Sequence, residues 1–148
     1  MTARNIHATA LLIGDRGILV IGASGSGKTA LALAMVDRFS THGRPCRLVG
    51  DDRLLVSVHG GRLVCRAPET IAGSVEVFGI GPRPIAFEPA MVADLVIRLV
   101  PPAAAERLQA DAVETIAGCT LPRVDLVERS VNTALPVVAA RLGLAPFV

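Results

Sequence analysis

A glycine-rich run near the amino terminus constrains this chain more than any other feature. The segment Gly22-Ala23-Ser24-Gly25-Ser26-Gly27-Lys28-Thr29 fits the pattern G-x-x-x-x-G-K-[ST] at each fixed position. It lies between an apolar stretch typical of a strand, Ile18 to Ile21, and one typical of a helix, Ala30 to Phe39. This order of strand, loop and helix is the context in which the pattern forms a phosphate-binding loop, or P-loop.

Each residue type in the run has a physical reason to be there. Glycines let backbone N–H groups face a phosphate without obstruction by a Cβ atom, and the start of a helix adds the positive end of its dipole. Lys28 is the only lysine among fifteen basic residues, and a compact ammonium on a flexible stem can reach into a phosphate cradle. The hydroxyl of Thr29 is a candidate ligand for Mg²⁺. We therefore predict that the whole run, residues 22–29, binds a nucleotide.

Length and composition restrict the class of protein. A chain of 148 residues, 51% of them hydrophobic, can bury one sizeable core, so we expect a single domain over residues 1–148. The net charge of +2, the absence of an arginine run and the four Phe without Tyr or Trp argue against a nucleic-acid partner. We see no targeting leader and no apolar stretch long enough to span a membrane, so we expect a cytoplasmic protein. Its three cysteines, Cys46, Cys65 and Cys119, are expected to be reduced packing residues.

The pattern of apolar residues and turn signals predicts an α/β fold with a mixed β-sheet. Two hairpins are indicated, because apolar runs flank Gly14-Asp15-Arg16-Gly17 and Gly60-Gly61. The predicted strands are Thr9 to Ile13, Ile18 to Ile21, Arg47 to Val49, Leu54 to Val58, Arg62 to Cys65, Val75 to Ile80, Ala93 to Val100 and Val124 to Val127. The predicted helices run from Thr29 to Phe39, from Ala103 to Leu108 and from Thr133 to Leu142, the last with Pro136 in its first turn.

Four further polar residues are candidates for chemistry. Asp51 and Asp52 follow a predicted strand after the P-loop helix, at the kind of strand end where ligands bind in open α/β sheets. Away from a P-loop such a pair is more often a turn or a helix cap; next to one, it can hold a metal or orient a nucleophile. Glu76 interrupts an apolar strand, where it could simply face solvent, and His7 alone would be read as a surface or capping residue.

Taken together, these motifs resemble the catalytic domain of bacterial HPr kinase/phosphorylase. That family has a histidine about fifteen residues before its P-loop, as His7 stands before Gly22. Its Val-Ala-Asp-Asp strand end is similar to Val49-Gly50-Asp51-Asp52, and its Glu-Ile-Arg-Gly-x-Gly signature is similar to Glu76-Val77-Phe78-Gly79-Ile80-Gly81. The resemblance is dense from His7 to Gly81, about half the chain, and weak beyond it.

The resemblance implies an activity and a role for each matched residue. The activity is transfer of a phosphoryl group from ATP, with Mg²⁺, to a serine of an HPr-type phosphocarrier protein, which regulates the phosphotransferase system and carbohydrate metabolism. Lys28 would hold the phosphates, Thr29 and Glu76 would serve Mg²⁺ with Asp51 as a further candidate ligand, Asp52 would be the general base, and His7 would be a further catalytic residue. The implied fold is the P-loop core shared with phosphoenolpyruvate carboxykinase. A homo-oligomer, the family's hexamer, is also implied.

Three departures from the family pattern qualify this reading. Phe78 stands where the family signature has arginine, which argues against the reverse, phosphorylase activity. A later family arginine has no secure counterpart, and Arg107 is a candidate only by proximity. The family's Pro-Val-Arg-Pro-Gly-Arg-Asn element is also missing, since Leu121-Pro122-Arg123-Val124-Asp125 is the nearest stretch. Full-length members carry an N-terminal domain, so we expect this chain to be a short form.

Two alternatives remain open from the sequence. One is a P-loop kinase acting on a small molecule, which would need a lid with arginines to close over its acceptor. The other is a nucleotide-binding regulatory module that switches partner contacts without turnover, and the absence of arginine at position 78 makes it credible.

Overall fold

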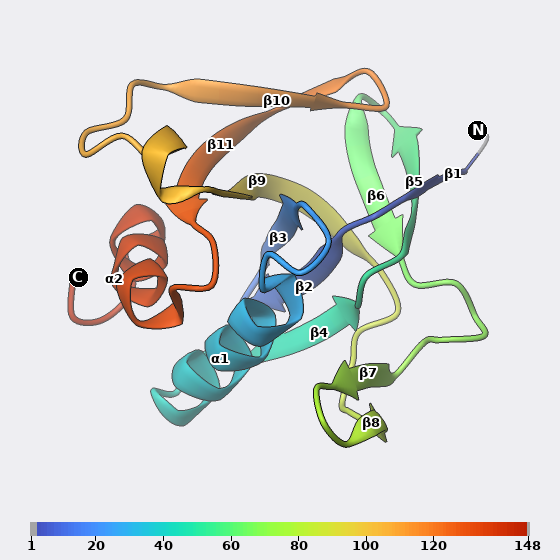
Figure 1. Ribbon diagram of the computed structural model, residues 1–148. Coiled ribbons are helices and arrows are strands. Elements are labelled where there is room, and N and C mark those ends of the chain that lie inside the picture. Colours follow the sequence, from blue (N-terminus) through green and yellow to red (C-terminus); the bar gives the residue numbers. More distant parts are fainter. Residues whose placement is uncertain (1–2, 148) are drawn as a thin grey trace.

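The computed structural model describes residues 3–147, and a curled β-sheet of mixed strand direction forms its centre (Figure 1). Its strands run in the order β1-β5-β6-β9-β3-β2-β4, with β11 along the second half of β9 and β10 outside β11. The strands are β1 Arg4–Ile6, β2 Thr9–Ile13, β3 Arg16–Gly22, β4 Cys46–Gly50, β5 Leu54–His59, β6 Arg62–Arg66, β9 Met91–Val100, β10 Ala112–Ile116 and β11 Cys119–Val127. Strands β7 Ser74–Val77 and β8 Gly81–Pro84 form a separate hairpin. The predicted α/β class with a mixed sheet is confirmed.

Helices α1 Lys28–Thr41 and α2 Val131–Leu142 cover one face of the sheet (Figure 1). In α1 the buried residues Leu31, Met35 and Phe39 recur every fourth position, which places them on one stripe of the helix. Strand β3 alternates in the same way: Ile18 and Val20 pack toward the helices, whereas Leu19 packs in a second core on the other face. The chain thus buries both faces of its central strands, the second by curling β5 and β6 over them.

Glycine at position 17 is required by the close approach of β3 and β9. A Cβ atom there would lie 1.9 Å from the carbonyl oxygen of Val92, at a point where the register of the two parallel strands shifts. The N–H of Gly17 donates to Asp94 at 2.8 Å. This contact fixes how β9 runs beside the strand that leads into the glycine-rich loop.

Several predicted boundaries were wrong. The expected helix from Ala103 to Leu108 is only a 3₁₀ turn, η1 Pro102–Ala104, because the double proline before it favours an extended chain. The expected strand from Val75 to Ile80 ends at Val77, where a turn closed by the N–H of Ile80 on the Val77 carbonyl leads into β8. The expected strand from Val124 to Val127 is the end of the longer β11, and β1, β8 and β10 were not predicted. Helix α2 begins at Val131, so Pro136 lies beyond its first turn.

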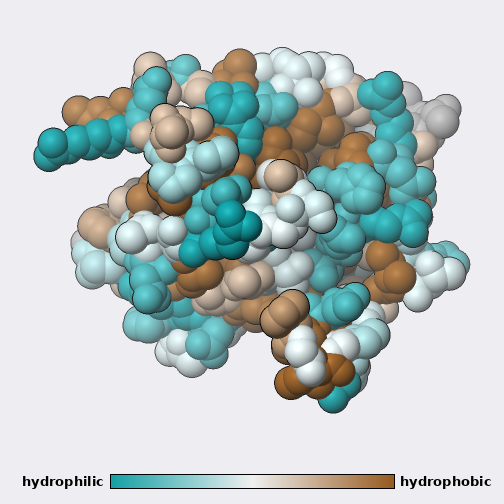
Figure 2. Space-filling model, in the orientation of Figure 1, coloured by the Kyte–Doolittle hydropathy of each residue, from teal (hydrophilic) through white to brown (hydrophobic). Residues whose placement is uncertain are grey.

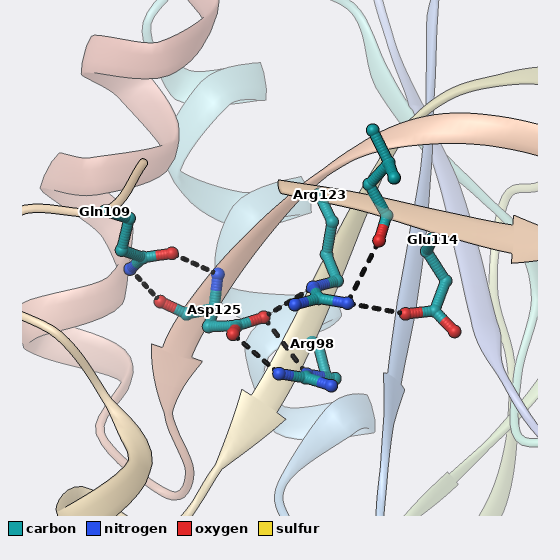
Figure 3. Close-up of polar contacts among 6 residues, drawn as sticks. Arg98, Gln109, Glu114, Arg123 and Asp125 are labelled. Atoms are coloured by element: carbon teal, nitrogen blue, oxygen red, sulfur yellow. Dashed lines mark hydrogen bonds and ion pairs between the residues drawn. The ribbon is translucent and has the colours of Figure 1, made fainter. Parts of the chain in front are cut away.

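An ion-pair network braces β9, β10 and β11 on the face away from α2 (Figure 3). Asp125 accepts from Arg98 at 3.1 and 2.7 Å and lies 2.9 Å from Arg123, which in turn donates to Glu114 at 3.0 Å. The amide of Gln109 bonds the backbone of Asp125 on both sides. The hydrogen bond with Asp125 raises the pKa of Arg98, so this arginine stays charged.

The cysteines are free and buried, as expected from the sequence. Burial raises the pKa of the thiols of Cys46 and Cys65 to about 12. Within residues 3–147, no helix combines the length and hydrophobicity needed to cross a membrane.

Candidate active site

Four strands end at the same edge of the sheet and together define the site. Strand β3 is parallel to β9, β9 is parallel to β11, and β4 runs in the direction of β3 because both are antiparallel to β2. Their carboxyl ends lead into the glycine-rich loop, into Asp51-Asp52, into Pro101 and into Glu128-Arg129. Ligands of α/β sheets bind at edges of this kind.

The glycine-rich loop has a geometry suited to phosphate. Gly25 and Gly27 have positive φ angles of 78° and 95°, which L side chains rarely adopt. Lys28 is buried, at 7% exposed, and its ammonium folds back over the loop, donating to the carbonyl oxygens of Gly22 at 3.1 Å and Ala23 at 3.2 Å. The hydroxyl of Ser26 is buried and has no hydrogen-bond partner in the protein. An orphaned buried hydroxyl and a buried ammonium at the start of α1 both fit an anionic ligand.

Asp51 is tied to the loop and to β2. Its Oδ1 atom accepts from the hydroxyl of Thr29 at 2.7 Å and from that of Thr9 at 3.1 Å. The oxygen of Thr9 also accepts the N–H of Asp52 at 3.2 Å, and Thr9 is fully buried. Antiparallel pairing of β2 with β4 brings the start of one strand beside the end of the other. A buried threonine therefore orients both aspartates, a role that the sequence reading missed.

Asp52 differs from Asp51 in exposure and backbone conformation. It is exposed, whereas Asp51 is half-buried. Its φ angle of 67° is left-handed, a conformation that Asp and Asn tolerate better than most residues and that clusters at functional sites. Its backbone is held by the Ala8 N–H, which donates to the Asp52 carbonyl at 3.2 Å. The carboxylate thus stands at the end of a constrained turn, accessible to a ligand.

Asp51, Asp52 and Glu76 line one cavity with Lys28 and Thr29. This carboxylate cavity has a volume of about 800 Å³. Its outer wall is the β7–β8 hairpin, which carries Glu76 and projects from the body with apolar residues toward its tip (Figure 2). Phe78 lines the cavity but is otherwise fully exposed. The structure thus brings the glycine-rich loop, the Asp51-Asp52 pair and the segment with Glu76 to one space.

The donors of this cavity suit a magnesium ion bound together with phosphates. Residues 3–147 contain no group of three or more His, Cys, Asp or Glu side chains arranged as a metal cage. Mg²⁺ rarely uses such a cage: it keeps several waters and takes one or two carboxylates plus substrate phosphates. The hydroxyl of Thr29 and the carboxylates of Asp51 and Glu76 are oxygen donors of the right kind.

Two sequence candidates lie away from the cavity lining. His7 is exposed and lines no part of the carboxylate cavity, although its neighbour Ala8 bonds the backbone of Asp52. Its catalytic role stays a prediction. Arg107 is exposed in the segment between η1 and β10 and is also absent from the lining.

Arg129, late in the chain, is an arginine that the structure does bring to the loop. Its N–H donates to the Ser26 carbonyl and its guanidinium to the Gly25 carbonyl, both at 3.0 Å. A second nitrogen of its guanidinium bonds Glu128 at 2.9 Å. Arg129 lies in the short connection between a predicted strand and a predicted helix, and no sequence motif marks that connection. Only the parallel pairing of β11 with β9 reveals its proximity to the loop.

A glycine-rich loop of the P-loop pattern at the end of a central strand, with aspartates following another strand of the sheet, defines the class: an α/β protein with a mixed sheet and a candidate phosphate-binding loop. The chain belongs to the family of the HPr Serine kinase C-terminal domain, whose family model matches residues 1–126. The family likeness therefore extends past Gly81, beyond the segment where the motifs are dense.

Curated relatives and a solved structure agree with this assignment. HPr kinase/phosphorylase of Mycoplasmopsis pulmonis is 34% identical over 76 residues, which is 51% of this chain and 23% of the relative. That of Brevibacillus brevis is 38% identical over 77 residues, again 51% of this chain and 23% of the relative. The matches thus span about a quarter of the length of these relatives. The Hpr(Ser) kinase/phosphatase from Coxiella burnetii has the same fold, with a TM-score of 0.79, 23% identity, and coverage of 94% of this chain and 95% of that one.

Proposed function

We propose that this chain is an ATP- and Mg²⁺-dependent kinase that phosphorylates a serine of an HPr-type phosphocarrier protein. The observation that carries the proposal is the carboxylate cavity. It places the loop lysine, the threonine hydroxyl that follows it and two acidic segments in one space, in a chain of the HPr Serine kinase C-terminal domain family. These are the parts that phosphoryl transfer requires.

The position and exposure of each residue indicate its role. Lys28 and the N–H groups of the loop would hold the phosphates, and the Thr29 hydroxyl, which bonds Asp51, would serve the cation together with Glu76. When bound, Mg-ATP supplies the γ-phosphoryl group and a cation that offsets its charge. The exposed carboxylate of Asp52 accepts the proton of the acceptor serine as that oxygen forms its bond to phosphorus and the bond to ADP breaks.

The acceptor approaches an open cavity beside the β7–β8 hairpin. The hairpin that forms the outer wall carries exposed apolar residues, Phe78 and Ile80, which offer a contact surface larger than a small metabolite needs. This favours a protein acceptor over a small-molecule acceptor. Without arginine at position 78, we expect the forward, kinase direction to dominate. The homo-oligomer implied by the family resemblance and the cytoplasmic location expected from the sequence stay predictions.

The test is transfer of label from γ-labelled ATP with Mg²⁺ to a purified HPr-type carrier. We expect label on a carrier serine, and its loss in Lys28→Ala and in Asp52→Asn. Label on a metabolite with no protein acceptor would instead identify a small-molecule kinase. ATP binding that depends on Lys28, without transfer to any acceptor but with altered partner affinity, would identify a regulatory module.

A further inference from the structure

A second cavity lies on the other side of the glycine-rich loop from the aspartates. This apolar pocket has a volume of about 210 Å³ and is walled by the first turn of α1, the ends of β9 and β11, and the first turn of α2. Apart from Arg129 and Ser130, its lining residues are glycine or aliphatic, among them Leu99, Val127 and Val131. The roles assigned above to the loop and the carboxylates do not use this pocket.

The pocket is continuous with the phosphate loop. Gly27, Ala30 and Arg129 line both it and the carboxylate cavity, so a ligand with its phosphates on the loop meets both spaces. The carboxylates occupy only one of them. The terminal phosphate of the donor must face the acceptor, so the rest of the donor must leave the loop in another direction. The apolar pocket is the space on the side of the loop without acidic residues.

We propose that the apolar pocket holds the base of the donor nucleotide. This inference rests on the proposed function, because it takes the donor to be a nucleoside triphosphate. A heterocyclic base is the flat, largely apolar part of such a ligand, and a volume below the roughly 300–1,000 Å³ of drug-sized sites suits a fragment of that size. Acidic side chains, which would repel the nearby phosphates, are not among the lining residues.

The polar side chains in the lining are already engaged. The hydroxyl of Ser130 donates to the Glu128 carbonyl at 3.2 Å, and the guanidinium of Arg129 bonds Gly25 and Glu128. The pocket also lacks an aromatic side chain on which a base could stack. It therefore recognises a base by shape and apolar contact and discriminates weakly between bases, because strong discrimination needs side chains that hydrogen-bond to base edges.

The first experiment compares ATP with inorganic tripolyphosphate by calorimetry. Both ligands place phosphates on the loop, but only ATP carries a base. Val131→Phe adds bulk to the pocket, and Val137→Phe makes the same change on the exposed face of α2, outside both cavities. We expect Val131→Phe to weaken ATP binding by roughly ten-fold and to leave tripolyphosphate within about two-fold, whereas Val137→Phe changes neither.

The outcomes separate this inference from the function on which it rests. ATP binding that is indifferent to Val131→Phe would overturn the base subsite alone. Failure of the unmodified protein to bind either ligand would overturn the proposed function and the subsite together. In the unmodified protein, ATP and GTP should bind within about five-fold of one another, and a preference of a hundred-fold or more would contradict recognition by shape.

A second experiment needs no variant and maps the base directly. The unmodified protein is photolabelled with 8-azido-ATP and digested with trypsin. Cleavage after Lys28, Arg38, Arg129 and Arg141 yields peptides 29–38 and 130–141, which together carry five residues of the pocket lining outside the loop. Label on these peptides supports the subsite. Label on peptide 67–98, which carries the β7–β8 hairpin, would place the base in the carboxylate cavity and overturn it.

Discussion

The two cavities beside the glycine-rich loop differ in the residues and in the structural elements that line them. The carboxylate cavity is walled by short, exposed segments: the turn after β4 and the β7–β8 hairpin, with Asp52 and Glu76 open to solvent. The apolar pocket is walled by the ends of two long strands and the first turns of two helices that belong to the main core. The loop and Arg129 are common to both.

This difference teaches how the site separates chemistry from affinity. Charged groups that face water can exchange protons and bind a cation, and they contribute little to the core. Aliphatic groups at the end of a packed core provide a dry, preformed surface that adds binding free energy without reacting. Substitutions in the carboxylate cavity should therefore change the rate of transfer, and those in the apolar pocket should change the affinity for nucleotide.

The largest effect that tests this separation is expected for Asp52→Asn. Asparagine keeps the shape and tolerates the left-handed φ angle of 67°, so only the ability to accept a proton is lost. We expect kcat for transfer to fall by roughly 10²–10⁴-fold, with the Kd for ATP unchanged. Asp37→Asn, at an exposed position of α1, is the matched control and should be neutral. A parallel loss of ATP affinity in Asp52→Asn would break the comparison.

Arg129→Ala should weaken both sides, because Arg129 borders both cavities and bonds two carbonyls of the loop. We expect a loss of about ten-fold or more in affinity for ATP and for tripolyphosphate alike, since a cation beside the phosphates is removed and the loop is released from one side-chain contact.

Arg107→Ala is the control for this prediction, because Arg107 is exposed and lines neither cavity. A merely structural role of Arg129 would lower thermal stability and leave tripolyphosphate affinity unchanged at temperatures where the protein is folded. That result, or an equal effect of Arg107→Ala, would contradict a role at the phosphates.

The sequence predicted the carboxylate side better than the apolar side, for a physical reason. A phosphate loop depends on residue types at fixed spacing along one segment, so Lys28 and Thr29 could be assigned from the chain alone. Asp51 and Asp52 follow a strand that returns to the same edge, which the alternation of strand and helix also predicts. The roles of these residues stay predictions, but the structure places them together.

The apolar side depends on long-range pairing, which local patterns do not encode. Leu99 and Val127 end up side by side because β9 and β11 are parallel neighbours, and no motif in either strand predicts that pairing. Thr9 lies 42 positions from Asp51 and was read only as the start of a strand. The double proline at 101–102 was expected to precede a helix, but only a 3₁₀ turn forms there.

Thr9→Val sharpens the comparison on the carboxylate side with a smaller effect. Valine has a similar shape but leaves the N–H of Asp52 without its acceptor at buried Thr9 and removes one donor to Asp51. We expect the free energy of unfolding to fall by about 1–3 kcal/mol and the Mg²⁺ concentration for half-maximal activity to rise a few-fold. Chemical denaturation and a magnesium titration measure the two effects.

The matched control is Thr115→Val, which removes an exposed hydroxyl that bonds Thr120 within the β10–β11 hairpin. It should change neither quantity appreciably. If Thr9→Val lowered stability with no change in the magnesium dependence, Thr9 would support the fold without orienting Asp51 toward a cation.

The smallest expected effect tests whether the ion-pair network on β9, β10 and β11 supports the apolar pocket (Figure 3). Arg98 and Asp125 are register partners, and Leu99 and Val127, one and two positions further along their strands, line the pocket. In Asp125→Asn, the ion pairs with Arg98 and Arg123 lose their charge, so we expect unfolding to become easier by about 1–2 kcal/mol. Glu69→Gln, in an exposed loop, is the control.

The functional consequence of Asp125→Asn should fall on one cavity only. The ratio of the affinity for ATP to the affinity for tripolyphosphate should fall by about two-fold as the strand ends loosen, while kcat for transfer is unchanged.

The hydrogen bond with Asp125 raises the pKa of Arg98, so this contribution to stability is present below the ordinary arginine pKa and is lost only above it. The loss in Asp125→Asn should therefore be the same at about pH 6 and about pH 8. A fall in kcat with unchanged discrimination would show that the ion-pair network supports the carboxylate side instead, and that the two cavities are not energetically separate.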